Sequence, residues 1–230
     1  MKRSEINAII DHTIDFLHKH DIKLPPFGYW TPDQWQTKGS ECEEIFDCML
    51  GWDVTDFGSG DFNKVGLTVF TTRNGHKDNS KYTAKTYCEK ILIIGEQQIT
   101  PMHFHWYKQE DIINRCGGNL QIKLYNKTKD NSFDDTEIEV TLDGVKRSVS
   151  AGSVITLEPG ESITLPVGLF HEFWAEPNKG KVISFEVSNV NDDLTDNFFI
   201  DQPRFPAIEE DCEPTHYLCT EYGARTKKNV

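Results

Sequence analysis

The stretch TPMHFHWYKQED, from Thr100 to Asp111, contains the clearest candidate metal ligands of this 230-residue chain. Side chains alternate along an extended strand, so His103 and His105 point to the same face. Two imidazoles placed in this way can share one cation, and a turn could bring the carboxylate of Glu110 back to the same ion. Two histidines alone leave a metal site short of ligands, however, and a strand histidine is more often a partly buried polar residue. The rest of the chain must decide between these interpretations.

The overall composition restricts the class of function. The formal net charge is −13 at pH 7, which opposes binding to nucleic acids and anionic membranes, because both require a basic surface. The amino-terminal residues are too polar for a signal peptide, and no stretch approaches the length of a membrane span. The six cysteines form no C-x-x-C pair, so we expect reduced thiols in a cytoplasmic protein. We therefore expect neither a nucleic acid nor a membrane as a partner.

Short segments rich in β-branched and aromatic residues dominate the chain between residues 65 and 190. Runs such as VGLTVFTTR and KVISFEVSNV are separated by clusters of Gly, Pro, Asn and Asp, a spacing that predicts an antiparallel barrel or sandwich. Isoleucines at helical spacing, preceded by a predicted N-cap at Ser4, indicate an amino-terminal helix. We therefore predict one mainly β domain over residues 1–230. It comprises an N-terminal helical layer (1–60), a barrel (65–190) and a C-terminal strap (191–230), with residues 51–66 as a loop.

A second stretch, GESITLPVGLFHEFW at residues 160–174, supplies a further histidine. It follows the pattern G-x5-P-x-G-x2-H and ends that pattern at His171, while the first stretch follows H-x-H-x4-E-x6-G. The two patterns together resemble the two motifs of the cupin superfamily. This resemblance implies a cupin-type antiparallel β-barrel (jelly roll) with one metal site formed by His103, His105, Glu110 and His171. Such a ligand set suits a divalent first-row ion: Mn²⁺, Fe²⁺, Co²⁺, Ni²⁺ or Zn²⁺.

A longer resemblance covers nearly the whole chain. The segments PPFGYWTPDQW, FEVSNVNDDLTDNFF and RFPAIEEDCEP look like those of the bacterial D-lyxose isomerase family. Membership would imply a metal-dependent interconversion of free sugars, D-lyxose with D-xylulose and commonly D-mannose with D-fructose. It would also imply Mn²⁺ as the preferred ion and a homodimer as the assembly.

The chemistry of such a reaction suggests roles for further residues. Moving a proton between C1 and C2 of a sugar requires an electrophile, a base and an acid. The metal would be the electrophile, Glu110 could shuttle a proton, and Lys108 would place positive charge beside the substrate where an enediolate forms. Strand alternation puts Glu186 on a polar face that would point into a cupin barrel, either as a second base or as a carboxylate that orients a ligand. The resemblance places Asp193 and Arg204 at the distal hydroxyls of the sugar.

Other interpretations of the same residues stay open at this level. Lys108 and Glu186 would be solvated surface residues if their strand faces pointed outward. The four ligands would also suit an Fe²⁺-dependent dioxygenase. A phosphosugar isomerase would need a cluster of basic residues, which the regions around the motifs lack. A non-catalytic sugar-binding or storage cupin would not depend on Glu110.

Overall fold

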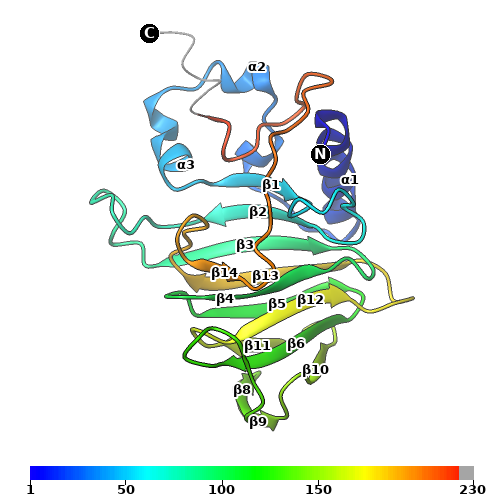
Figure 1. Cartoon of the computed structure of the whole chain (residues 1–230). Helices are drawn as coiled ribbons and strands as arrows, with labels where there is room; N and C mark the ends of the chain where they lie inside the picture. Colours follow the sequence, from blue (N-terminus) through cyan, green and yellow to red (C-terminus); the bar gives the residue numbers. More distant parts are fainter. Residues whose placement is uncertain (223–230) are drawn as a thin grey trace.

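Two antiparallel β-sheets face each other in the computed structural model, which describes residues 1–222 (Figure 1). The strands of one sheet follow the order β1-β2-β3-β13-β5-β11-β8-β9. Those of the other follow β10-β6-β12-β4-β14, with β7 paired to β6. The strand bounds are β1 Gly51–Thr55, β2 Leu67–Arg73, β3 Tyr87–Ile94, β4 Thr100–His105, β5 Glu110–Gly117, β6 Leu120–Lys127, β7 Phe133–Asp134, β8 Ile138–Leu142, β9 Val145–Val149, β10 Val154–Leu157, β11 Ser162–Leu165, β12 Phe170–Ala175, β13 Val182–Asn189 and β14 Asn197–Phe199. The predicted mainly β architecture is confirmed.

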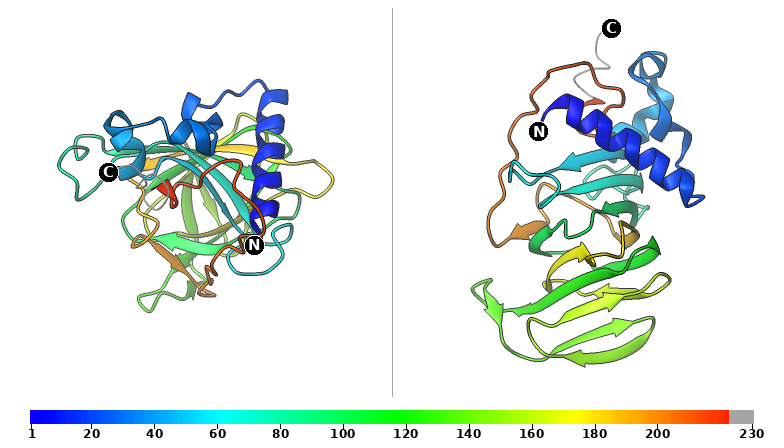
Figure 2. Two further views of the ribbon diagram at one scale, coloured as in Figure 1. Left: turned by 90° about the horizontal axis from the view of Figure 1, so that it is seen from above. Right: turned by 90° about the vertical axis from the view of Figure 1, so that its right-hand side faces the viewer.

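Helices gather at one end of the molecule, beside β1 and far from β8 and β9 (Figures 1 and 2). They are α1 Arg3–Lys19, α2 Pro32–Trp35 and α3 Glu43–Asp47, with 3-10 turns at Pro26–Tyr29 and Ser40–Cys42. The apolar stripe of α1, represented by Ile6 and Ile10, packs on the outward face of the larger sheet. None of the described helices is long and apolar enough to cross a membrane.

The amino-terminal helix begins two residues earlier than predicted. Lys2, and not Ser4, is the N-cap, and the Glu5 side chain accepts a hydrogen bond from the Lys2 N–H at 2.9 Å. The Ser4 hydroxyl instead donates to Asp211 at 2.6 Å. Buried Arg3 also binds two carboxylates of the carboxy-terminal segment. The first turn of α1 therefore holds the end of the described chain in place.

Residues 51–55, predicted to be loop, form the edge strand β1. The segment pairs with β2 from Gly51↔Thr71 to Thr55↔Leu67. Trp52 and Val54 are buried beneath α1, and this packing stabilises a strand that Gly and Asp make unpromising from local propensity alone. The predicted helical layer over residues 1–60 therefore also contains a strand of the barrel.

The strap after β13 crosses the opening of the barrel. Its strand β14 pairs with β4, so that Asn197 lies opposite His105 and Phe199 opposite His103. Buried Asp196 accepts hydrogen bonds from the backbone N–H groups of Tyr107 (2.7 Å) and Lys108 (3.2 Å). The strap is thus joined directly to the segment that carries the candidate metal ligands. Residues 223–230 of the predicted strap lie outside the described part of the chain.

Candidate active site

Three histidines from two neighbouring strands form a cluster inside the barrel. His103 and His105 lie on β4, and the antiparallel pairing of β12 with β4 sets His171 opposite His103. One nitrogen of each ring lies within 4.8 Å of one nitrogen of the others, and all three residues are buried. Separations of this size fit a common cation between the rings. The group could therefore hold a metal ion.

The tautomers of two of these histidines fit that role. A carbonyl oxygen can only accept, so Nδ1–H of His103 donates to Pro101 O (2.7 Å) and Nδ1–H of His171 to Leu169 O (3.0 Å). Each ring then presents the lone pair of Nε2, as metal-bound imidazoles do. Nε2 of His171 is buried and, since it carries no proton in this tautomer, makes no hydrogen bond among the described residues. Burial, together with the neighbouring imidazoles, lowers the pKa of His103 well below its usual value, which favours the neutral, ligating form.

Glu110 reaches the histidines from the opposite sheet. It is the first residue of β5, and its strand position, not the turn expected from the sequence, brings the carboxylate back. Its oxygens lie 3.1 Å from Nε2 of His171 and 3.4 Å from Nε2 of His105. Burial disfavours a charged carboxylate, but Lys108 and His105 outweigh this effect and hold the pKa of Glu110 well below its usual value. An anionic oxygen donor therefore lies beside the imidazoles of His105 and His171.

Lys108 is buried between two carboxylates. Its Nζ lies 2.7 Å from Oε1 of Glu186 and 2.9 Å from Oε2 of Glu110. Burial alone would disfavour the ammonium, yet these two carboxylates raise the pKa of Lys108 above its usual value. Lys108 is therefore a fixed positive charge and not a solvated surface lysine.

Glu186 points inward from β13, on the polar face that strand alternation indicated. Its Oε1 accepts hydrogen bonds from Lys108 and from the Ser188 hydroxyl (3.0 Å), whereas Oε2 has no partner among the described residues. Lys90 on β3 lies 3.9 Å from the same Oε1 and donates to Asn191 at 2.7 Å. One oxygen of the carboxylate is thus anchored, and the other is left for chemistry.

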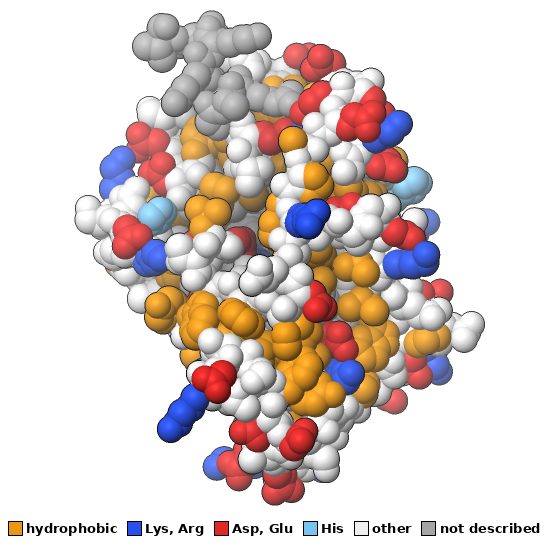
Figure 3. Space-filling model, viewed as in Figure 1, with side chains coloured by type: hydrophobic (Ala, Val, Ile, Leu, Met, Phe, Trp, Pro, Cys, Tyr) orange, Lys and Arg blue, Asp and Glu red, His pale blue; other side chains and the backbone are white. Residues whose placement is uncertain are grey.

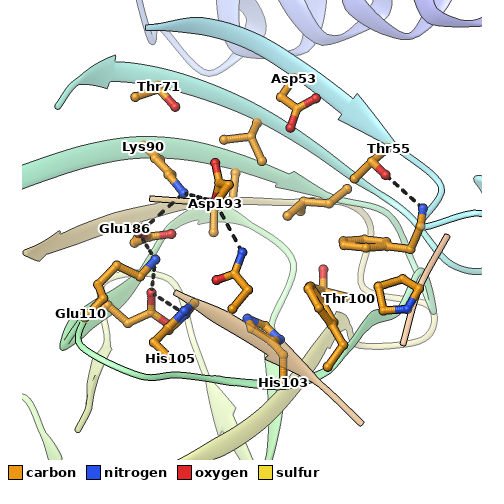
Figure 4. Close-up of a pocket in the computed structure, with 18 of the residues that line it drawn as sticks. Asp53, Thr55, Thr71, Lys90, Thr100, His103, His105, Glu110, Glu186 and Asp193 are labelled. Carbon is orange, nitrogen blue, oxygen red and sulfur yellow. Dashed lines mark hydrogen bonds and ion pairs between the residues drawn. The ribbon is translucent and has the colours of Figure 1, made fainter. Parts of the chain in front are cut away.

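These groups line a cavity of about 430 Å³, within the range of small-molecule sites. His103, His105 and Glu110 lie on one side in Figure 4, and Asp53 and Thr71 lie on the other. Hydrophobic side chains gather on the face of the molecule that carries the strap (Figure 3). Leu194 and Phe205 of the strap are exposed and also line the cavity. Inside the cavity Phe199 of the strap stacks on His103, with ring centroids 5.1 Å apart. The result is a polar floor beneath a largely apolar lid.

The two residues predicted at the distal end of a sugar have different positions. Asp193 lines the cavity, and its carboxylate lies 3.6 Å from Nζ of Lys90. Arg204 is exposed, and its neighbours Pro203 and Phe205 line the cavity while Arg204 itself does not. The position of Arg204 was expected from the family resemblance, but in the structure its side chain is exposed and does not line the cavity.

Two further charged residues that line the cavity were not predicted from the sequence. Lys90 and Asp53 both lie on strands whose neighbouring residues are apolar and packed outward, namely Ile91 on β3 and the pair Trp52 and Val54 on β1. Alternation along these runs was the available signal: Asp53 lies between two outward apolar residues and Lys90 beside one, so both side chains are expected to point into the barrel.

Comparison with known proteins agrees with this geometry. The sequence model of the D-lyxose isomerase family matches residues 1–222. The chain belongs to this family. It is 50% identical over 225 residues to the D-lyxose/D-mannose isomerase of Escherichia coli O157:H7, across 96% of this chain and 98% of the relative. The D-lyxose/D-mannose isomerase of Serratia proteamaculans is 49% identical over the same shares. The chain is accordingly an isomerase.

Solved structures support the fold assignment. The L-ribose isomerase of Cellulomonas parahominis without ligand superposes with a TM-score of 0.59 at 14% identity, covering 91% of this chain and 97% of that chain. The L-ribose isomerase of Geodermatophilus obscurus gives the same TM-score at 13% identity, covering 91% of this chain and 98% of that chain. The predicted cupin-type barrel is confirmed.

Proposed function

We propose that this isomerase interconverts D-lyxose with D-xylulose and D-mannose with D-fructose. It would use one divalent ion per subunit, with Mn²⁺ as the preferred ion. The observation that carries the proposal is the buried row Glu110–Lys108–Glu186 beside the three histidines, with Nζ–O distances of 2.9 and 2.7 Å. The names of the two relatives that are about 50% identical support the choice of sugars.

The ion would be held by His103, His105, His171 and Glu110, and when bound it supplies Lewis acidity that polarises the sugar carbonyl. Glu186 is the base that takes the proton from carbon, because its Oε2 has no partner among the described residues while Oε1 is held by Lys108 and Ser188. The ammonium of Lys108 stabilises the negative charge that develops on the enediolate oxygens. Lys90 places a second positive charge 3.9 Å from Oε1 of Glu186.

A second part of the proposal concerns the setting of the enzyme. We propose a homodimer in the cytoplasm, consistent with six free thiols. Light scattering of the purified protein would test the dimer, and a monomer or tetramer would contradict it.

The experiment for the reaction is a substrate panel. The protein loaded with Mn²⁺ is incubated with D-lyxose, D-xylulose, D-mannose, D-fructose and mannose 6-phosphate, and products and dissolved oxygen are followed together. We expect aldose–ketose conversion of the free sugars without oxygen uptake. Oxygen consumption would favour the dioxygenase alternative, and preference for the phosphate ester would favour a phosphosugar isomerase. Conversion of none of the free sugars would refute the proposal.

A further inference from the structure

The far end of the cavity carries a carboxylate that the reaction outlined above does not use. Asp53 lies in the middle of edge strand β1, where outward-packed Trp52 and Val54 force its side chain to the inner face. It lines the cavity, and its carboxylate points inward, toward Asp193 (Figure 4). Asp53 therefore faces whatever occupies the cavity.

The Asp53 carboxylate has free acceptor capacity. A carboxylate offers about four lone-pair sites. The backbone N–H of Val54 is the one hydrogen-bond donor that we find for it among the described residues. The hydroxyl of neighbouring Thr55 accepts a hydrogen bond from the N–H of Phe57, at 2.9 Å, and makes no hydrogen bond to Asp53 that we find among the described residues. A partly buried acceptor without side-chain donors suits a ligand that brings hydroxyl groups.

Strand order sets the position of Asp53 relative to the reacting groups. Glu186 on β13 is followed across the sheet by Lys90 on β3, then by β2 and finally by Asp53 on β1. Three strand spacings of about 4.8 Å separate β13 from β1, so their backbones are roughly 14 Å apart. Both side chains point into the curled sheet and shorten this span toward the length of an open-chain sugar. A sugar whose C1 and C2 lie at Glu186 would direct its last carbon to Asp53.

The charges at this end select against anions. Asp53 and Asp193 face the cavity together, and the nearest cation, Lys90, is shared with Asn191 and Glu186. Burial raises the pKa of Asp53 to about 6, and the charge of Asp193 adds to this effect, so the pair already disfavours negative charge. A phosphate or carboxylate brought here would lose water next to two like charges. A neutral hydroxyl donates a hydrogen bond instead.

The side walls complete a site for the carbon chain of a sugar. Phe57 packs near Phe199 and Phe205 of the strap, with centroid distances of 5.8 and 6.3 Å. Leu67 and Val69 of β2 also line the cavity. Apolar walls around a few fixed acceptors are typical of sites that bind small polar molecules in one orientation.

We propose that Asp53, together with Asp193, binds the terminal hydroxyl group of the aldose and excludes sugars that carry an anion at that end. The inference rests on the proposed isomerisation of free sugars and adds the residue that recognises the end of the chain away from the metal. Asp53 is a specificity residue, because it contacts the substrate far from the carbon that loses its proton.

The test measures kcat/KM of Asp53→Ala and Asp53→Asn with D-mannose and with 6-deoxy-D-mannose, which lacks the terminal hydroxyl. We expect Asp53→Ala to lose about 10- to 100-fold on D-mannose, mainly through KM, and less than 3-fold on the deoxy sugar. Asp53→Asn, which keeps the shape and an acceptor oxygen, loses less in the same direction. It serves as the variant for comparison if the alanine protein does not fold. The matched control is Asp56→Asn, which changes a carboxylate that binds the N–H groups of Gly58 and Gly60. We expect this variant to change kcat/KM by the same factor on both sugars.

Equal losses on both sugars, or no loss on D-mannose, would overturn the role of Asp53 while leaving the proposed function intact. Turnover of mannose 6-phosphate by the wild-type protein as fast as D-mannose would overturn it as well. A wild-type protein that converts no free sugar would instead refute the proposed function, and the inference with it.

Discussion

Lys108 and Glu186 lie 78 positions apart in the sequence and form a buried ion pair, with Nζ and Oε1 at 2.7 Å. The pair joins the segment that carries the candidate metal-binding histidines to the central strand β13 of the larger sheet. Taking two charges out of water is costly, so such a pair persists when further hydrogen bonds satisfy it, as Glu110, Ser188 and Asn191 do here. Its place in the cavity makes it the expected centre of the chemistry.

Replacing Lys108 tests the electrostatic part of the mechanism. We expect Lys108→Ala to lower kcat about 10²- to 10³-fold, because the developing oxyanion loses its fixed positive charge. Metal content, measured by mass spectrometry, should stay near that of the wild type, since Lys108 is not a ligand. Lys123→Ala, which removes a lysine paired with Glu172 at 3.6 Å outside the cavity, is the control. Unchanged turnover with the metal retained would show that Lys108 does not act on the substrate.

Glu186→Gln tests the assignment of the base. The amide keeps the size of the side chain but cannot take a proton, so we expect kcat to fall about 10²- to 10⁴-fold with a much smaller change in KM. Exchange of the C2 proton of D-lyxose with deuterium oxide, followed by NMR, should fall in parallel. Glu172→Gln on β12 is the matched control. If Glu186→Gln exchanges the proton at the wild-type rate, another group is the base.

Removing one imidazole of the histidine cluster should abolish the stabilisation of the fold by added Mn²⁺. Adding Mn²⁺ at 100 times its dissociation constant stabilises a folded protein by about 2.7 kcal/mol, which corresponds to a rise in Tm of roughly 5 to 10 °C for a chain of this size. We expect this rise in the wild type and its loss in His171→Ala, while His12→Ala on the exposed side of α1 retains it. Differential scanning calorimetry measures the shift. A full Tm rise in His171→Ala would place the ion elsewhere.

Asp53 should reduce the stability of the folded chain at neutral pH. Burial raises its pKa from 3.8 to about 6, with Asp193 adding to the effect and Lys90 opposing it. The thiol of Cys219 is another titratable group that lines the same cavity. The folded protein binds this proton more tightly than the unfolded chain, so stability is gained as pH falls from above 6 toward 3.8. Asp53→Asn should therefore be more stable than the wild type at pH 8, by roughly 1 to 2 kcal/mol.

That advantage should shrink as the pH approaches 4, and urea unfolding at pH 8, 6 and 4.5 measures it. Asp56→Asn provides the contrast. The two carboxylate oxygens of Asp56 accept from Gly58 and Gly60, and the asparagine amide keeps only one of these acceptors. It should destabilise the protein at every pH. A loss of stability in Asp53→Asn at pH 8 would mean that the carboxylate has a structural role.

Several parts of the site could be predicted from sequence because they depend on short-range spacing. His103 and His105 share a face by alternation alone, and the pattern around His171 pointed to the same site. The inward orientation of Glu186 followed from the apolar residues on either side of it. In each case a strand of clear β character carried the residue.

Other parts could not be predicted because they depend on contacts between distant segments. Asp53 lies in a five-residue strand that owes its form to the packing of Trp52 and Val54 under α1. Arg204 belongs to a polar run whose direction is set by the pairing of β14 with β4. Glu110 reaches the site from the opposite sheet because it begins β5. This strand is hard to recognise in the sequence, because its residues EDIINRCG are largely polar.

The most direct test of the central claim, a metal-dependent isomerase, is activity on D-lyxose after removal and return of the ion. The protein is stripped with a chelator, its fold is checked by circular dichroism, and D-xylulose formation is measured before and after adding Mn²⁺, Co²⁺, Ni²⁺, Fe²⁺ or Zn²⁺ singly. We predict that the stripped, folded protein forms no ketose and that Mn²⁺ restores the rate most fully. Full activity of the stripped protein, or no recovery with any ion, would contradict the account.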